Sequence, residues 1–416
     1  MSQRSPVRPM RILILTQYYP PESGAPQNRL SDLARRLTAS GHTVTILTAL
    51  PNYPKGEIFE GYRGGILFEE LSQGIRVIRT WIYATQSKNF IQRLLNYFSF
   101  VLCSLLGGMW KLGRQDIVVV ESPPLFLGLS GLLLSHLKKA KFVFNVSDLW
   151  PESAVAMGIL HNRALIGLSR GLEEFLYRRS HLITGQTRGI IENIQSRIPD
   201  KRVSLMTNGV NVQTFTDAMQ DDQIKQVKGL FGLEGKFVVG YAGLHGLAQN
   251  LEIVLSAARI LRGHQDILFT LFGDGPEKEK LIRLAEEYRL DNIIFTPTQS
   301  ASLIPAVVAS FDVALVPLRR LDLFKGALPS KMFEAMAAAV PLVVSIEGEA
   351  QKLVNDAQAG ICVEPENSEA LADAILQLYT DLPYRKTLGQ NGRRYVIEHY
   401  DRARIAREFE NLLLML

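Results

Sequence analysis

The chain has 416 residues, of which 47% are hydrophobic and 21% charged. This composition suits about two globular domains and excludes a disordered chain. The net charge of +5 suits an anionic substrate or a weak attraction to anionic lipid, and equally an ordinary soluble surface. Long basic runs with interleaved aromatic residues are absent, which argues against nucleic-acid binding. The two cysteines are far apart and no His-rich or carboxylate cluster occurs, so no protein-bound metal is predicted.

Short apolar strands alternate with amphipathic helices along the chain, after a loose tail predicted for residues 1–9. In the first half, strands are predicted at residues 11–16, 43–48, 116–121, 141–148, 181–185 and 202–207. The pattern then restarts, with strands predicted at residues 237–241, 267–272, 293–296, 312–317, 342–345 and 360–364. Repeated strand–helix–strand units indicate an α/β protein with two doubly wound parallel sheets.

A turn sequence at residues 208–211 separates the two patterns, and we place the domain boundary near residue 205. The prediction is therefore a first Rossmann-like domain at residues 1–205 and a second at residues 206–401. The amphipathic stretch at residues 402–416 is expected to pack back on the first domain. Two such domains face each other across a cleft, and ligands bind outside the carboxyl ends of the strands.

An uncharged and mostly apolar segment covers residues 96–110, with basic residues on both sides within residues 91–114. It is shorter than the roughly 20 residues that span a bilayer. The segment is therefore read as a helix packed inside the protein or a helix that also touches a membrane surface, with a true span as the least favoured alternative.

Two loops of the first half follow strands and carry polar residues. The loop at residues 18–26 enters the first helix through Gly24, where backbone can approach an anionic ligand, although a plain turn explains it equally well. The loop at residues 145–152 places the carboxylates of Asp148 and Glu152 near Trp150. They could orient sugar hydroxyls, or Asp148 could merely cap a turn.

In the second half, the loop at residues 241–246 follows a strand and contains two glycines before a helix. Its backbone N–H groups could cradle a diphosphate around Gly243. His245 in this loop is as readily a structural residue as a ligand. Base selection is expected to depend on backbone contacts around Thr296.

The sharpest pattern is Pro329, Ser330, Lys331 and, one turn later, Glu334. Ser330 can cap a helix that begins near Lys331. A cation in the first turn opposes the helix dipole, and a bound anion would offset that cost. Glu334 lies on the same side and could accept both hydroxyls of a ribose. The alternative is an ordinary solvated helix start.

Taken together, these loops resemble glycosyltransferase family 4, which has a GT-B fold of two Rossmann-like domains. The resemblance covers nearly the whole chain and looks most like the bacterial surface-polysaccharide branch, with its fucosamine and colanic-acid-type transferases. Its motifs are Gly41-His42, Ser147-Asp148-Leu149-Trp150-Pro151, Thr207-Asn208-Gly209-Val210, Gly243-Leu244-His245-Gly246 and Pro329-Ser330-Lys331 with Glu334.

The resemblance implies a retaining, metal-independent transfer from a nucleoside-diphosphate sugar to a hydroxyl of a growing, lipid-linked glycan. It implies no cofactor. UDP linked to an N-acetylated sugar is the first expectation for the donor, and a GDP-sugar the second. The protein would be cytoplasmic, at the inner face of the membrane, with residues 91–114 as the peripheral contact. The expected residues are Asp148 and Lys331 for catalysis, Gly24, Gly243, His245, Thr296, Lys325, Pro329, Ser330, Lys331 and Glu334 for the donor, and Ser147, Trp150 and Glu152 for the acceptor.

The chain departs from the family pattern at three places. Gly326 stands where the first of two glutamates is common, and Ser147 stands where many members have a histidine. Residues 244–250 lack the usual arginine and lysine, so Lys331, helped by Lys325 or Arg319, is the expected phosphate cation.

Two other classes of protein share this architecture. The first is a different enzyme, such as a sugar-nucleotide 2-epimerase or a phosphorylase. The second is a non-catalytic protein that binds a sugar nucleotide or acts as a membrane scaffold, which the missing glutamate and histidine leave open.

Overall fold

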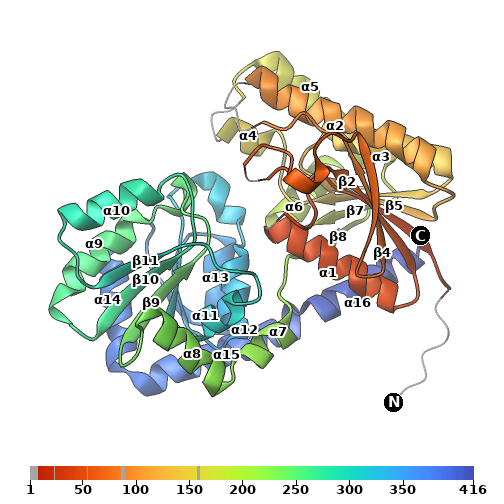
Figure 1. Ribbon diagram of the computed structural model, residues 1–416. Helices are drawn as coiled ribbons and strands as arrows, with labels where there is room; N and C mark the ends of the chain where they lie inside the picture. The colour runs from red at the N-terminus through yellow and green to blue at the C-terminus, as the bar shows by residue number, and fades with distance from the viewer. Residues whose placement is uncertain (1–7, 23, 54, 86–89, 157–159) are drawn as a thin grey trace. The chain divides into compact units, whose positions relative to one another are not determined.

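The computed structural model describes residues 8–416 except 23, 54, 86–89 and 157–159. The predicted loose tail at residues 1–9 therefore lies almost wholly outside the described residues. The chain divides into two compact units, Met1–Asn208 with Arg402–Leu416, and Gly209–Asp401. Each unit contains one sheet with helices on both faces, which confirms the predicted α/β fold class (Figure 1).

The first unit is built on an eight-stranded sheet in the order β3-β4-β2-β1-β5-β6-β7-β8. Its strands are β1 Arg11–Leu15, β2 Thr43–Ala49, β3 Leu67–Ser72, β4 Ile75–Thr80, β5 Ile117–Ser122, β6 Lys141–Val146, β7 Leu182–Gly185 and β8 Val203–Leu205. All pairings are parallel except that of β3 with β4. The β3–β4 hairpin was not predicted, and it extends the sheet beyond β2.

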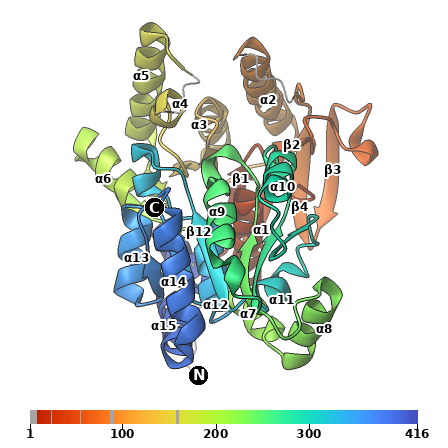
Figure 2. The same cartoon turned by 90° about the vertical axis from the view of Figure 1, so that its left-hand side faces the viewer.

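Helices of the first unit cover its sheet in two layers. They are α1 Ala25–Ala39, η1 Glu60–Tyr62, α2 Phe90–Lys111, α3 Leu127–Lys138, α4 Glu152–Ala156, α5 Arg163–Arg179, α6 Arg188–Arg197 and α16 Arg402–Leu414. One face packs against α2, α3 and α5, and Figure 2 shows α3 between the other two. The opposite face packs against α1 and α16, as predicted for the C-terminal stretch.

The second unit has a six-stranded parallel sheet in the order β11-β10-β9-β12-β13-β14. Its strands are β9 Phe237–Ala242, β10 Ile267–Phe272, β11 Ile293–Thr296, β12 Val313–Pro317, β13 Leu342–Ser345 and β14 Gly360–Cys362. Its helices are α7 Val212–Ala218, α8 Asp221–Phe231, η2 Leu247–Gln249, α9 Glu252–Ile260, η3 Leu261–Gly263, α10 Lys278–Glu287, α11 Ile304–Ala309, η4 Asp322–Gly326, α12 Ser330–Ala337, α13 Glu349–Ala357, α14 Ser368–Thr380 and α15 Leu382–His399. One apolar core lies on each side of this sheet.

Among the described residues, no helix has the length and apolar character needed to cross a membrane.

Candidate active site

In each sheet there is one pair of adjacent strands from which the chain continues to opposite sides of the sheet. In the second sheet this switch point lies between β9 and β12, because β9 continues to β10 on one side and β12 to β13 on the other. The carboxyl ends of β9 and β12 lead into the loop at residues 243–246 and, through η4, into helix α12. Ligands of doubly wound sheets bind at such a switch point. The predicted donor residues around Gly243 and Lys331 therefore lie at the expected edge of this sheet.

Glycines allow two neighbouring loops of this edge to pack backbone against backbone. A Cβ atom on Gly273 would lie 2.0 Å from the Gly243 carbonyl oxygen, and φ at Gly273 is +134°. The loops are joined by hydrogen bonds from Gly243 N–H to the Phe272 carbonyl (2.9 Å) and from His245 N–H to the Asp274 carbonyl (2.8 Å). These two N–H groups are thus already used by the fold.

The other two N–H groups of the loop remain available. Within the described part of the chain, those of Leu244 and Gly246 have no acceptor. A cradle for phosphate oxygens would therefore use alternate N–H groups of this loop.

Lys331 projects from the first turn of α12 onto Tyr241 at the end of β9. Its Nζ donates a hydrogen bond to the Tyr241 hydroxyl (2.7 Å) and lies 3.9 Å from the centre of the ring. The hydroxyl in turn donates to the Leu244 carbonyl oxygen (2.7 Å). A Cβ atom on Gly243 would lie 2.9 Å from Lys331 Nζ. The structure thus brings Lys331 and the glycine loop into direct contact.

The charge of Lys331 is poorly compensated where it lies. Burial lowers the pKa of its ammonium group to about 7, and the nearby Glu334 carboxylate raises it by less. Glu334 follows Lys331 by three residues in α12, a spacing that places two side chains on the same side of a helix. A diphosphate placed beside Lys331 would supply the missing negative charge and would favour the protonated ammonium.

His245 lies under this site and is fully buried. Burial, with a further effect from Lys278, lowers the pKa of its ring to about 4, so the ring is neutral at physiological pH. Neither ring nitrogen forms a hydrogen bond with any residue that the structure describes, and the ring lies 5.9 Å from that of Tyr241, centre to centre. As it lies, the ring has no exposed surface that a ligand could contact.

Other predicted donor residues are held by neighbours of their own. Lys325 pairs with Asp322 at 2.7 Å in an exposed turn of η4. Arg319 donates from Nε to the Leu247 carbonyl oxygen (2.7 Å). The carbonyl oxygen of Thr296 accepts a hydrogen bond from Lys278 (2.8 Å). Neither predicted helper of Lys331 is therefore an unengaged cation.

The start of α12 differs from the prediction. The sequence suggested that Ser330 caps the helix, but α12 begins at Ser330 itself and Pro329 precedes it without any side-chain cap. That prediction is wrong because Pro329, with φ of −59°, already directs the chain into the helix. The first N–H groups of α12 are consequently not capped by Ser330.

In the first unit, Ser147 belongs to a buried polar network at the carboxyl ends of β5 and β6. Its hydroxyl donates to Glu121 and accepts from Arg29 (3.1 Å) and Gln186 (2.5 Å). Arg29 also pairs with Glu121 at 2.5 Å, and Glu121 accepts from Asn145 (2.6 Å). A hydroxyl has one donor and two acceptor positions, so that of Ser147 is fully used within the protein.

The residues after Ser147 have different surroundings. Burial raises the pKa of the Asp148 carboxyl. Trp150 packs edge-on against Phe126, with 5.9 Å between ring centres. Glu152 pairs with Arg170 at 3.2 Å. Of the predicted catalytic and acceptor side chains, the half-buried Asp148 is the carboxylate that has no ion-pair partner in the described part of the chain.

Gly24 lies just before α1 in the first unit, so it belongs to a different compact unit from Lys331. Its φ of 166° is extended backbone that any residue adopts. The loop before it is fixed instead by the buried Glu22 carboxylate, which accepts N–H groups of Asn52 and Tyr53 at 2.8 Å each. Arg79 is also buried and donates to the Pro20 carbonyl oxygen (2.5 Å).

Sequence reasoning assigned no role to several side chains of these sites, including Tyr241, Arg29 and Glu121. The signal for Glu121 was a single carboxylate at the end of an otherwise apolar strand. That for Arg29 was a charge directly beside the apolar stripe of α1. A buried charge needs a partner, so the two could have been paired.

No group of three His, Cys, Asp or Glu side chains that could hold a metal ion occurs among the residues that the structure describes.

Comparison with protein families gives two adjoining matches. The glycosyl transferase 4-like domain matches residues 24–209, and the glycosyl transferases group 1 family matches residues 222–395. Together they cover most of both compact units.

Individual proteins resemble the chain along nearly its full length. One relative is the Escherichia coli protein WcaI, which is named as a colanic acid biosynthesis glycosyl transferase. It is 26% identical over 97% of this chain and 99% of the relative. A GDP-mannose-dependent alpha-mannosyltransferase of Mycolicibacterium smegmatis is 23% identical over 93% of each. The structure of Anabaena HepE in complex with UDP-glucose has a TM-score of 0.72 at 16% identity, over 98% of this chain and 100% of that one.

Proposed function

Because this chain is a GT-B glycosyltransferase, formed by a glycosyl transferase 4-like domain and a group 1 domain, we propose that it transfers a sugar from a nucleoside diphosphate to a surface-polysaccharide glycan. The observation that carries the proposal is the contact of Lys331, Tyr241 and Gly243 at the switch point of the second sheet. There an under-compensated ammonium lies beside unpaired backbone N–H groups, an arrangement suited to a diphosphate.

We assign the donor to the second unit. Lys331 and the N–H groups of Leu244 and Gly246 bind the diphosphate and stabilise the charge that develops as it leaves. Glu334 accepts the ribose hydroxyls. UDP with an N-acetylated sugar is the preferred donor and a GDP-sugar the second choice, in line with the donor named for the mycobacterial relative.

The acceptor is a hydroxyl of a lipid-linked glycan, and the transfer retains the anomeric configuration. These two parts rest on the family resemblance and on the polar edge of the first sheet. Asp148 accepts a hydrogen bond from the acceptor hydroxyl, which orients its oxygen for attack. Ser147, as part of its buried network, fixes the backbone that carries Asp148.

The test of the donor site is the Glu334→Ala variant. We expect its affinity for UDP to fall about tenfold or more, since a hydrogen bond to a charged group contributes about 1.5–3 kcal/mol. Glu369→Ala is the matched control, because Glu369 is an exposed glutamate in the first turn of α14. Calorimetric titration with UDP measures both. Equal affinity of Glu334→Ala and wild type would refute the ribose role.

We also propose that helix α2 contacts the membrane surface. Its exposed face carries large apolar side chains at helical spacing, namely Leu95, Phe98, Leu102, Leu106, Met109 and Trp110. The helix has no carboxylate and is followed by the exposed Arg114. This combination fits a bilayer surface rich in anionic lipid.

Sedimentation with vesicles tests this contact. We expect binding to vesicles that contain phosphatidylglycerol and weaker binding to pure phosphatidylcholine, with a loss at high salt. The double variant Leu102→Asp and Leu106→Asp should abolish binding. Leu230→Asp, which changes an exposed leucine of α8, should bind as wild type does. Equal loss in both variants would contradict a specific role for α2.

A further inference from the structure

Helix α12, which carries Lys331 and Glu334, is too short to fix its own position. It has eight residues, and isolated helices shorter than about 12–15 residues are marginal in water. Its position therefore depends on the elements that pack against it. These include α15 and α7 of the same compact unit, and the three helices lie together in Figures 1 and 2.

The carboxyl end of α12 is held by one arginine of α15. Three of the last four carbonyl groups of α12, those of residues 334–336, accept backbone N–H groups from the turn that follows, at 2.9–3.1 Å. The fourth, on the fully buried Ala337, accepts a hydrogen bond from Arg393 Nη1 (2.5 Å). Because a buried carbonyl without a partner is costly, Arg393 completes the hydrogen bonding of this helix end.

Arg393 also ties α12 to α7. Its Nη2 donates to the Thr216 hydroxyl (2.8 Å), which in turn donates to the Val212 carbonyl oxygen (2.9 Å). The acceptors of the guanidinium, which include the Met219 sulfur, are all neutral, and no carboxylate pairs with it in the described part of the chain. A cation at the carboxyl end of a helix is favourable against the helix dipole, and the same dipole favours an anion at the amino end, where Lys331 lies. Arg393 and a bound diphosphate would thus stabilise opposite ends of one helix.

Glycines let α15 approach α12 closely enough for these bonds. A Cβ atom on Gly389 would lie 2.1 Å from the Ala339 carbonyl oxygen, in the turn that follows α12. A Cβ atom on Gly392, directly before Arg393, would lie 3.3 Å from Met336 Cγ. The backbone of α15 therefore rests on the carboxyl end of α12, and this contact fixes Arg393 relative to that end.

Lys331 lies roughly 9 Å from Ala337 along the axis of the same helix. A helix of two turns moves as a unit, so a shift at its carboxyl end displaces Lys331 from Tyr241 and from the loop of Gly243. We propose that Arg393 is a positioning residue of the donor site, which sets the place of Lys331 by holding the carboxyl end of α12. This inference rests on the proposed function, since Arg393 acts on the donor only through Lys331.

Calorimetric titration of the full chain with UDP tests this role. We expect Arg393→Gln to bind UDP about tenfold more weakly than wild type, because the charge-assisted hydrogen bond to the helix end is lost and Lys331 is displaced. Arg394→Gln is the matched control, since Arg394 is the exposed neighbour in α15 and carries the same charge. It should bind UDP as wild type does.

Two further measurements separate positioning from a general loss of stability. Leu378→Ala removes a fully buried side chain from the core on the other face of the sheet. It should lower the free energy of unfolding, measured with urea, without changing the affinity for UDP. In a Lys331→Met background, Arg393→Gln should weaken UDP binding much less than in wild type, because the side chain that it positions is already gone.

Three outcomes would each overturn the positioning role. They are equal affinities of wild type and Arg393→Gln, an equal loss in Arg394→Gln or Leu378→Ala, and an undiminished effect of Arg393→Gln in the Lys331→Met background. If wild type fails to bind UDP, or Lys331→Met binds it as tightly as wild type, the proposed donor site fails instead. The two failures are therefore distinguishable.

Discussion

Lys331, the cation of the proposed donor site, is half-buried against the end of β9. Its contacts are a phenol ring and a hydroxyl, and the nearby Glu334 only partly offsets the cost of burying the charge. With a pKa of about 7, the ammonium is charged below neutral pH and increasingly neutral above it. A diphosphate binds the charged form and, by linkage, raises this pKa.

The affinity for UDP should therefore fall as pH rises above 7. We expect a loss of about fifteenfold in total between pH 7 and 8.5, because a group with a pKa of about 7 is about half protonated at pH 7 and the loss approaches tenfold per pH unit only well above that pKa. The terminal phosphate of UDP is itself protonated in mildly acid solution, so the informative range lies above neutrality. Calorimetric titration at several pH values gives the slope.

Lys331→Met is the reference for this slope. This variant keeps the aliphatic stem against Tyr241 but has no titrating group, so its weaker binding should not depend on pH in this range. A wild-type affinity that stays constant from pH 7 to 8.5 would show that Lys331 does not carry the phosphate charge.

The elements that carry the proposed donor residues could be predicted from the sequence better than the contacts of those residues. The motif around Lys331 and Glu334 lies on a helix start after a strand, and a strand–helix pattern is readable in one dimension. The role of Tyr241 as the partner of Lys331 could not be predicted in this way. The two residues are 90 positions apart in the sequence, and they come into contact only because β9 and β12 are neighbours in the sheet. Ser147 was likewise expected to face the acceptor, whereas its hydroxyl is fully used by Arg29, Gln186 and Glu121.

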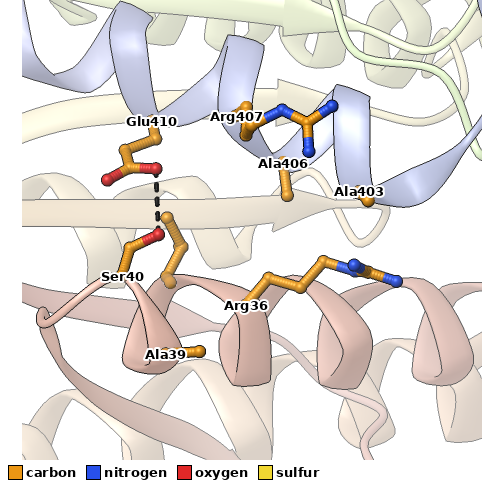
Figure 3. A pocket seen from close by; sticks show the side chains of 8 residues that line it. Arg36, Ala39, Ser40, Ala403, Ala406, Arg407 and Glu410 are labelled. Atoms are coloured by element: carbon orange, nitrogen blue, oxygen red, sulfur yellow. Dashed lines mark hydrogen bonds between the residues drawn. The ribbon is translucent and has the colours of Figure 1, made fainter. Parts of the chain in front are cut away.

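At the scale of whole elements, the C-terminal helix α16 completes the first unit. Phe409 and Leu413 are buried against α1 and the sheet. The buried Glu410 accepts from Ser40 (3.1 Å) and lies 3.1 Å from His42 Nε2. Ser40 and Glu410 line a groove of about 260 Å³ between α1 and α16. Figure 3 shows the hydrogen bond between them, with Arg36 and Arg407 nearby in the lining.

Phe409→Ala should destabilise the first unit by about 3–5 kcal/mol, as expected for a large aromatic side chain removed from a core. Phe409 is 1% exposed, whereas Leu414 at the end of the same helix is 42% exposed. Leu414→Ala should therefore change the free energy of unfolding by about 0.5 kcal/mol or less. Urea unfolding measures both, and a small effect of Phe409→Ala would mean that α16 docks only weakly.

Strands β3 and β4 were missed by sequence reasoning for different reasons. Strand β4 is almost wholly buried, but Arg76 and Arg79 interrupt its apolar run, whereas β3 lies at the edge of the sheet and has no fully buried residue. An edge strand of this kind needs no continuous apolar run, so its periodicity is weak. Buried central strands such as β1 and β10 were predicted almost to the residue, because burial on both faces demands apolar side chains throughout.

For the whole molecule, the division of the chain into units with separate cores has a thermodynamic consequence. The two main cores of the first unit share no residue with those of the second. Phe409 and the proposed donor residues consequently belong to different units. Domains that each bury their own core can unfold in separate steps.

We therefore expect two transitions in scanning calorimetry, of which UDP shifts one. At a hundredfold excess over its Kd, UDP stabilises the unit that binds it by about 2.7 kcal/mol. For a unit of this size, that corresponds to a rise in Tm of about 5–10 °C. Phe409→Ala should lower the other transition and leave the shift by UDP intact.

If UDP raises the same transition that Phe409→Ala lowers, either the two units unfold as one or the donor site lies in the first unit. Combining Phe409→Ala with Glu334→Ala decides between these cases, because only a donor site in the second unit loses its UDP shift with Glu334.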